Sequence, residues 1–140
     1  MLETIEENGF VFAKILYHDF QTPGIHFFTP PTYSQQLGYM HHPKGKLIQP
    51  HVHLPVPRTV DYTNEVLLIK SGKVRVDFFD SNDTFFTSRE LSQGDVILLI
   101  QGGHGFEALE ELEMIEIKQG PYAGDHDKRR FDPTPRKEST

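Results

Sequence analysis

The sequence contains no cysteine among its 140 residues. Disulfides, thiol nucleophiles and thiolate zinc sites are therefore excluded. Any metal that this chain binds must be held by imidazole nitrogens and carboxylate oxygens, which its 8 histidines and 20 acidic residues can supply.

Long apolar runs and a basic net charge are also missing. The longest unbroken apolar run, residues 96–100, is far too short to span a bilayer. The acidic start of the chain lacks the basic stretch and the apolar stretch of a signal peptide. A formal net charge of −6 argues against a nucleic-acid partner, which is recognised by a basic face. We therefore expect a soluble, cytoplasmic protein with neither a membrane nor a nucleic-acid partner.

Helical patterning is almost absent, because no long stretch carries apolar residues at helical spacing. Only residues 1–8 and 31–35 leave room for a short helix. Strand patterns dominate instead, and residues 73–78 alternate charged with apolar side chains after a turn at Ser71-Gly72. The expected strands are residues 10–16, 36–40, 46–52, 65–70, 73–78, 85–89, 95–100, 105–109 and 113–118, of which 95–100 is apolar on both faces and therefore central.

The length and the strand pattern together predict one all-β domain over residues 1–140. A chain of this size can form one substantial core. Many short strands separated by turn residues are typical of a sandwich or a barrel. The polar segment after Gly120 is expected to form an extended arm with a frayed end.

Two histidines have a spacing that would let them share one metal ion. His51 and His53 lie two residues apart, so on a strand their imidazoles project from the same face. On this spacing alone, two surface histidines are an equally good interpretation. Glu65 follows, and His104 comes later within a glycine-rich stretch.

These residues resemble the two motifs of the cupin superfamily. The first motif, His-x-His followed by a spacer, a Glu and a Gly, matches His51, His53, Glu65 and Gly72. The second motif, a Gly followed by a Pro-x-Gly and a His, matches Gly94, Gly102 and His104. The resemblance covers residues 36–118. It implies a cupin-type double-stranded β-helix, or jelly-roll barrel, with a short N-terminal extension and a C-terminal arm. It also implies one divalent metal ion held by His51, His53, Glu65 and His104.

The chain departs from this pattern at three places. Eleven residues, 54–64, separate His53 from Glu65, where the family has a shorter spacer. Ile100 replaces the proline of the second motif, and His104 comes one residue early. The long spacer makes Asp61 an alternative carboxylate ligand. Three imidazoles and one carboxylate suit iron, manganese, zinc or nickel, and they leave one or two positions for water or substrate.

Three further residues are candidates for binding a substrate. Arg58 lies in the segment that connects His53 to Glu65, where a guanidinium could bind a carboxylate or phosphate. An exposed arginine on a proline-rich loop is the competing interpretation. Tyr62 shares that segment, and His41 ends the expected strand 36–40 beside a turn, so it is either a surface residue or a base.

The function expected from this resemblance is a small metal-binding cupin that binds, or acts on, a small polar metabolite. The ligand class is carbohydrate-type, or a molecule that carries a carboxylate or phosphate. The alternatives are a non-catalytic ligand-binding or regulatory cupin and a metal-dependent dioxygenase, and the sequence leaves open whether the protein is an enzyme. A homodimer is expected because exposed strand edges need cover, with residues 10–16 as the candidate contact.

Overall fold

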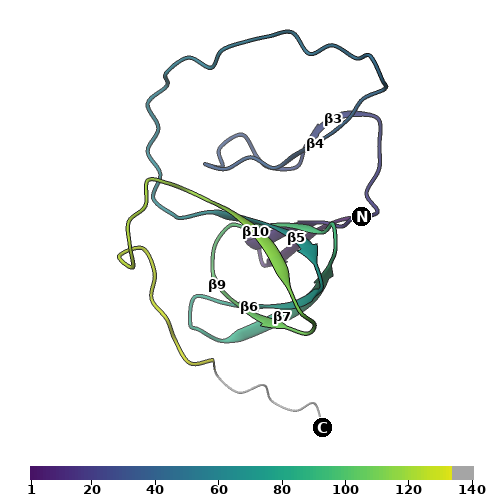
Figure 1. The fold of residues 1–140 in the computed structure, drawn as a ribbon. Coiled ribbons are helices and arrows are strands. Elements are labelled where there is room, and N and C mark those ends of the chain that lie inside the picture. Colours follow the sequence, from purple (N-terminus) through teal and green to yellow (C-terminus); the bar gives the residue numbers. More distant parts are fainter. Residues whose placement is uncertain (134–140) are drawn as a thin grey trace. The chain divides into compact units, whose positions relative to one another are not determined.

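The computed structural model describes residues 1–133, which form ten β-strands and no helix (Figure 1). The strands are β1 (Leu2–Glu7), β2 (Phe10–Leu16), β3 (Gly24–Phe27), β4 (Gly38–His41), β5 (Glu65–Ser71), β6 (Lys73–Phe79), β7 (Phe85–Ser92), β8 (Val96–Leu99), β9 (Gly103–Ala108) and β10 (Glu113–Lys118). The prediction of an all-β protein is confirmed. No helix long and apolar enough to cross a membrane occurs in this part of the chain.

The chain separates into two units. The first consists of Met1–Phe20 and Tyr62–Thr140, and the second is Gln21–Asp61. The first unit contains two antiparallel sheets, with strand orders β1-β2-β8-β5-β10 and β7-β6-β9. Both sheets contribute to one apolar core, an arrangement compatible with a β-sandwich.

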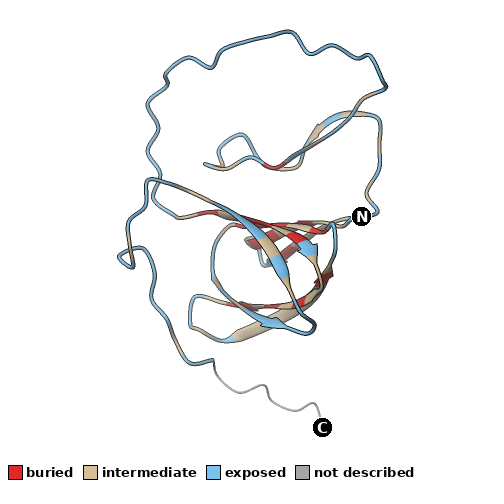
Figure 2. Cartoon of the chain, in the orientation of Figure 1, coloured by how far each residue is buried: buried red, intermediate tan, exposed pale blue. Residues whose placement is uncertain are grey.

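Alternating residues of the two sheets fill this core (Figure 2). Val74 and Val76 of β6 have no exposed surface, and Ile69 of β5 has 1%. Phe12 of β2 contacts the ring of Phe78 from the other sheet, with ring centroids 6.4 Å apart. Because burial of each such side chain stabilises the fold by about 1.5–3 kcal/mol, this shared core holds the two sheets together.

Strand β8 lies between β2 and β5, and its residues Ile97 and Leu98 are fully buried. The predicted central strand is thereby confirmed. Strand β2 is paired on both sides, with β1 and β8, and Phe12 is 1% exposed. Residues 10–16 therefore offer no free strand edge for the expected contact, and the homodimer itself stays a prediction.

The short helix considered for residues 1–8 is also wrong, because residues 2–7 form strand β1. Asn8 and Gly9 have positive φ angles of 49° and 82°. Such a pair makes the tight turn that returns the chain antiparallel along β2. Ile5 is then only 2% exposed, beside Ala13 of that strand. The sequence pattern of residues 1–8 does not reveal this burial, because it depends on the pairing with β2.

The second unit contains one hairpin, in which Gly24 pairs with His41 and Phe27 with Gly38. The sequence analysis did not predict β3. Residues 42–61 form no strand, so the strand expected at 46–52 is wrong. Most of this segment is exposed, as the pale blue trace in Figure 2 shows.

The C-terminal segment of the first unit packs against β6 and the loop that follows it. Arg129 donates two hydrogen bonds of 2.9 Å to the carboxylate of Asp83. The ring of Phe131 meets the edge of Phe79, with centroids 5.3 Å apart. The expected arm exists, and up to residue 133 these contacts attach it to the sheet that contains β6. Any fraying of its end would fall on residues 134–140, which lie outside the described residues.

Candidate metal-binding site

Two of the four predicted ligands meet at one end of the first unit. Glu65 begins β5, and it shares the core-facing side of that strand with Leu67 and Ile69. His104 of β9 pairs with Phe78 of β6, so its ring lies on the core-facing side of the other sheet. The Nε2 atom of His104 lies 3.7 Å from Oε2 of Glu65, and the two side chains are 31% and 15% exposed.

The surroundings change the pKa of both groups. Burial raises the pKa of Glu65, and the neighbouring carboxyl of Glu116 raises it further through its charge and a hydrogen bond. The Nζ atom of Lys118 lies 3.8 Å from Oε1 of Glu65 and acts in the opposite direction. Desolvation lowers the pKa of His104. His104 is therefore neutral at pH 7, which is the form that can donate a lone pair to a metal.

The Glu65–His104 pair has the chemistry and the spacing of two metal ligands. Carboxylate oxygen and imidazole nitrogen each bind transition ions at about 2.0–2.2 Å, so two such donors on one ion stand about 3–4 Å apart. The measured 3.7 Å falls in this range. A divalent cation would also remove the cost of charging Glu65 beside a second carboxylate.

His51 and His53 form a second pair of donors, in the second unit. Their ring centroids are 5.2 Å apart although the segment forms no strand. Nδ1 of His51 lies 3.0 Å from the carbonyl oxygen of Gln49. That hydrogen bond places the ring proton on Nδ1, which leaves the Nε2 lone pair available to a metal. Both histidines are exposed.

The four predicted ligands thus appear as two pairs, one in each unit. Among residues 1–133, no three histidine or acidic side chains form a group able to hold a metal. Asp61, the alternative carboxylate, is the last residue of the second unit, which also contains the histidine pair. The complete four-ligand site stays a prediction.

The predicted substrate-binding residues are solvent-exposed in the positions that the structure gives them. Arg58 and His41 belong to the second unit, and His41 is the last residue of β4. Tyr62 opens the second segment of the first unit and is 72% exposed. Their role in binding a ligand stays a prediction.

Sequence reasoning missed two charged residues beside Glu65. Glu116 and Lys118 share a face of β10 with Met114, which packs against the core. The alternation within residues 113–118 gave no such signal, because Ile115 and Ile117 make the opposite face of this strand the more apolar one. Lys118 also lies 3.9 Å from Asp127, whose carboxylate accepts a hydrogen bond of 2.9 Å from Thr63. The C-terminal segment therefore reaches the neighbourhood of Glu65.

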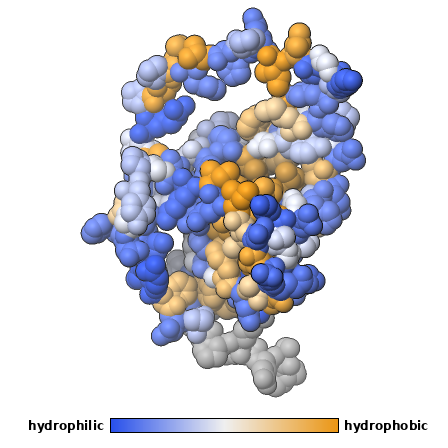
Figure 3. Space-filling view, viewed as in Figure 1, coloured by the Kyte–Doolittle hydropathy of each residue, from blue (hydrophilic) through white to orange (hydrophobic). Residues whose placement is uncertain are grey.

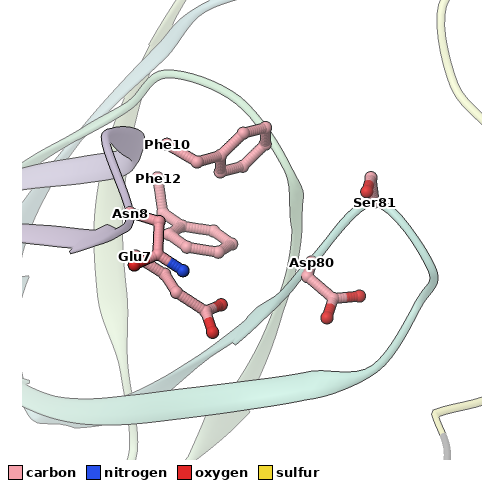
Figure 4. A pocket seen from close by; sticks show the side chains of 6 residues that line it. All are labelled: Glu7, Asn8, Phe10, Phe12, Asp80 and Ser81. Atoms are coloured by element: carbon pink, nitrogen blue, oxygen red, sulfur yellow. The ribbon is translucent and has the colours of Figure 1, made fainter.

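A shallow cavity of about 290 Å³ lies where the β1–β2 turn approaches the loop after β6. Its walls are the rings of Phe10 and Phe12 on one side and Asp80 and Ser81 on the other, as Figure 4 shows. Asp80 already accepts hydrogen bonds from the backbone N–H groups of its own turn. Asp80, on the polar wall of this cavity, therefore stabilises the turn that follows β6.

Comparisons with protein-family models, with curated proteins and with solved structures found no match to this chain.

Proposed function

We propose that this chain is a small metal-binding protein of the cupin type, which holds one divalent ion with His51, His53, Glu65 and His104. Two antiparallel sheets around one core are compatible with a jelly roll. The observation that carries the proposal is the Glu65–His104 pair, in which a carboxyl group and a neutral imidazole from different sheets face each other.

The ligand that we propose is a small polar metabolite bearing a carboxylate or phosphate, as some carbohydrate-type metabolites do. Lys118 supports this class, because its ammonium group lies 3.8 Å from Oε1 of Glu65. In the structure its ammonium group lies near the carboxylates of Glu65 and Asp127. An ion that neutralises Glu65 would leave the ammonium group of Lys118 able to bind an anionic ligand.

A bound divalent ion would supply Lewis acidity and an open coordination position. Residues near Glu65 would bind the ligand and exchange protons with it. Lys118 would orient an anionic group. Glu65, whose pKa is raised, can hold a proton in its hydrogen bond with Glu116. His104 stays neutral because of its desolvation. These roles serve turnover and simple binding equally, so the proposal names a ligand class and no reaction.

Metal content tests this proposal. Protein purified without a histidine tag should contain close to one iron, manganese, zinc or nickel per chain. Added metal should stabilise the fold by about 2.7 kcal/mol when its free concentration is ~100 times the dissociation constant. Glu65→Gln and His104→Ala should each abolish both effects. His26→Ala is the matched control, because that histidine lies on β3, contacts the carbonyl oxygen of Pro23 and is no predicted ligand, and it should retain them. The proposal would be contradicted if the purified protein contains no metal and none of the four ions raises its melting temperature.

A further inference from the structure

The carboxylate of Asp127 is turned toward the candidate site by the C-terminal segment, residues 120–133. Its side chain is only 20% exposed, although the residue as a whole lies on the surface. One oxygen, Oδ2, accepts the hydrogen bond from the Thr63 hydroxyl and also lies 3.9 Å from Nζ of Lys118. The Thr63 hydrogen bond, followed by the charge of Lys118, lowers the pKa of Asp127. An ionised carboxylate therefore lies against a hydroxyl donor and an ammonium donor.

The strands β5 and β10 position these two donors without help from the C-terminal segment. Lys118 is the last residue of β10, and it pairs with Glu65, the first residue of β5. The backbone N–H of Gln119 donates a hydrogen bond of 2.9 Å to the carbonyl oxygen of Asn64, so the pairing continues to the residue next to Thr63. Thr63 and Lys118, named here the anion subsite, are thus fixed by the paired strands, and the aspartate carboxylate is the group that occupies the subsite.

The C-terminal segment is attached most firmly beyond Asp127. Arg129 is bound to the loop after β6 by its two hydrogen bonds, and the ring of Phe131 comes 2.9 Å from the position that a Cβ on Gly103 would take. All but one of residues 121–128 are exposed, and Figure 3 shows mostly hydrophilic side chains, in blue, along this segment. Exposed segments with few apolar contacts open at a low free-energy cost. Asp127 can therefore leave the subsite while Arg129 and Phe131 stay attached.

The anion subsite suits a carboxylate better than a phosphate. One ammonium and one hydroxyl donor match the two oxygens of a single carboxylate. Acidic groups also surround Lys118, because Glu65 lies 3.8 Å away and Glu116 is hydrogen-bonded to Glu65. A phosphate group carries up to two negative charges at neutral pH, so these acidic groups repel it more strongly than they repel a carboxylate.

We propose that the anion subsite binds the carboxylate of the ligand, and that Asp127 occupies it in the free protein as an internal mimic that the ligand displaces. This inference rests on the proposed function, because the subsite adjoins Glu65, and it narrows the ligand class to carboxylates. A tethered carboxylate competes at an effective concentration on the order of millimolar. A free ligand therefore binds more weakly than the empty subsite would allow. Displacement releases residues 121–128, whereas the end of the segment stays attached through Arg129.

Titration with acetate tests whether Asp127 occupies a carboxylate subsite. Acetate replaces chloride at constant sodium concentration and pH 7 in metal-free protein with EDTA, and NMR follows the backbone amides of Thr63 and Lys118. Asp127→Ala should lower the apparent Kd for acetate by about tenfold, if the aspartate fills the subsite about nine-tenths of the time. Asp125→Ala is the matched control. It removes the same charge from the same segment, but Asp125 lies 3.6 Å from the exposed Arg130. The control should leave the Kd within about twofold of the wild-type value.

Two further titrations of the Asp127→Ala protein locate the subsite and identify its ligand class. Adding Thr63→Val should weaken acetate binding by at least about fivefold, because it removes the hydroxyl donor and keeps the shape of the side chain. Inorganic phosphate at the same sodium concentration should bind more weakly than acetate. The inference would be overturned by no acetate binding to Asp127→Ala, by equal effects of Asp127→Ala and Asp125→Ala, by no effect of Thr63→Val, or by tighter binding of phosphate.

Limited digestion with trypsin measures the displacement itself. Cleavage after Lys128 requires the surrounding backbone to leave its contacts. Acetate should accelerate this cleavage in the wild type and leave it unchanged in Asp127→Ala, where the segment is already released. Acetate without effect on either protein would overturn the displacement. The metal proposal fails separately: acetate binding with the expected effects sustains the subsite even if the protein binds no metal. Bound metal together with an unchanged acetate Kd in Asp127→Ala overturns the subsite alone.

Discussion

Removing the charge of Glu116 should change how the stability of the metal-free protein depends on pH. Burial and the carboxyl of Glu116 raise the pKa of Glu65 above its usual value. The native state therefore binds more protons than the unfolded state in the pH range just above the ordinary pKa of 4.5. Stability must fall as the pH rises through this range. Glu116→Gln removes the like charge, and the amide can donate a hydrogen bond to the ionised Glu65.

The size of the effect follows from the geometry. Two unit charges about 4 Å apart repel by ~4 kcal/mol at an effective dielectric constant of 20. Glu116 is exposed, which screens this repulsion, and protonation of Glu65 limits it further. We expect Glu116→Gln to raise the free energy of unfolding at pH 8 by about 1 kcal/mol, with a much smaller gain at pH 4.

Urea unfolding of metal-free protein at pH 4, 6 and 8 measures this difference. Glu113→Gln is the control, because it removes the same charge from the same strand. Its carboxylate instead lies near the exposed Lys70, at 3.7 Å. The control should change stability by less than ~0.5 kcal/mol at every pH. Equal effects of the two substitutions would refute the carboxyl pairing, since a general reduction of negative charge would then explain both.

Two other substitutions test the framework that positions the site. Asp95→Ala removes a buried carboxylate that accepts hydrogen bonds from the backbone N–H groups of His18 and Ser92, at 2.8 and 2.7 Å, and should cost about 3 kcal/mol in a thermal unfolding assay. Gly72→Ala places a Cβ against the carbonyl oxygen of Glu111 at a φ of 86° and should cost about 2 kcal/mol or more by urea titration. A loss below 0.5 kcal/mol in either case would contradict the local geometry.

Strands with strong local signals could be predicted from the sequence. Residues 10–16 and 113–118 were predicted with the observed limits, because alternation and turn residues bound them clearly. Strand β1 was missed although Asn8-Gly9 is a hairpin signal, since its acidic residues hid the alternation around Ile5. Residues 46–52 have strand-like composition and form no strand. A segment with strand-like composition forms a strand only where the fold places a second strand beside it.

The candidate site, like the strands, was predicted only in part from the sequence. The resemblance to the cupin motifs implied that Glu65 and His104 lie close together, and their side chains do lie 3.7 Å apart. No local pattern linked them to Lys118, because the neighbourhood depends on β10 pairing beside β5 across more than forty intervening residues. A family resemblance proposes candidate ligands, whereas pairing between distant strands determines the charges around them.

The attachment of the C-terminal segment affects where the protein can be labelled. Arg129 anchors that segment to Asp83, and Asp127 brings it to Lys118 beside Glu65. A label attached to residues 127–129 would therefore add bulk and charge close to the candidate site. At the other terminus, the amino group of Met1 contacts the exposed carboxylate of Asp19. An N-terminal fusion disturbs only that surface contact, which makes it the better choice for binding measurements.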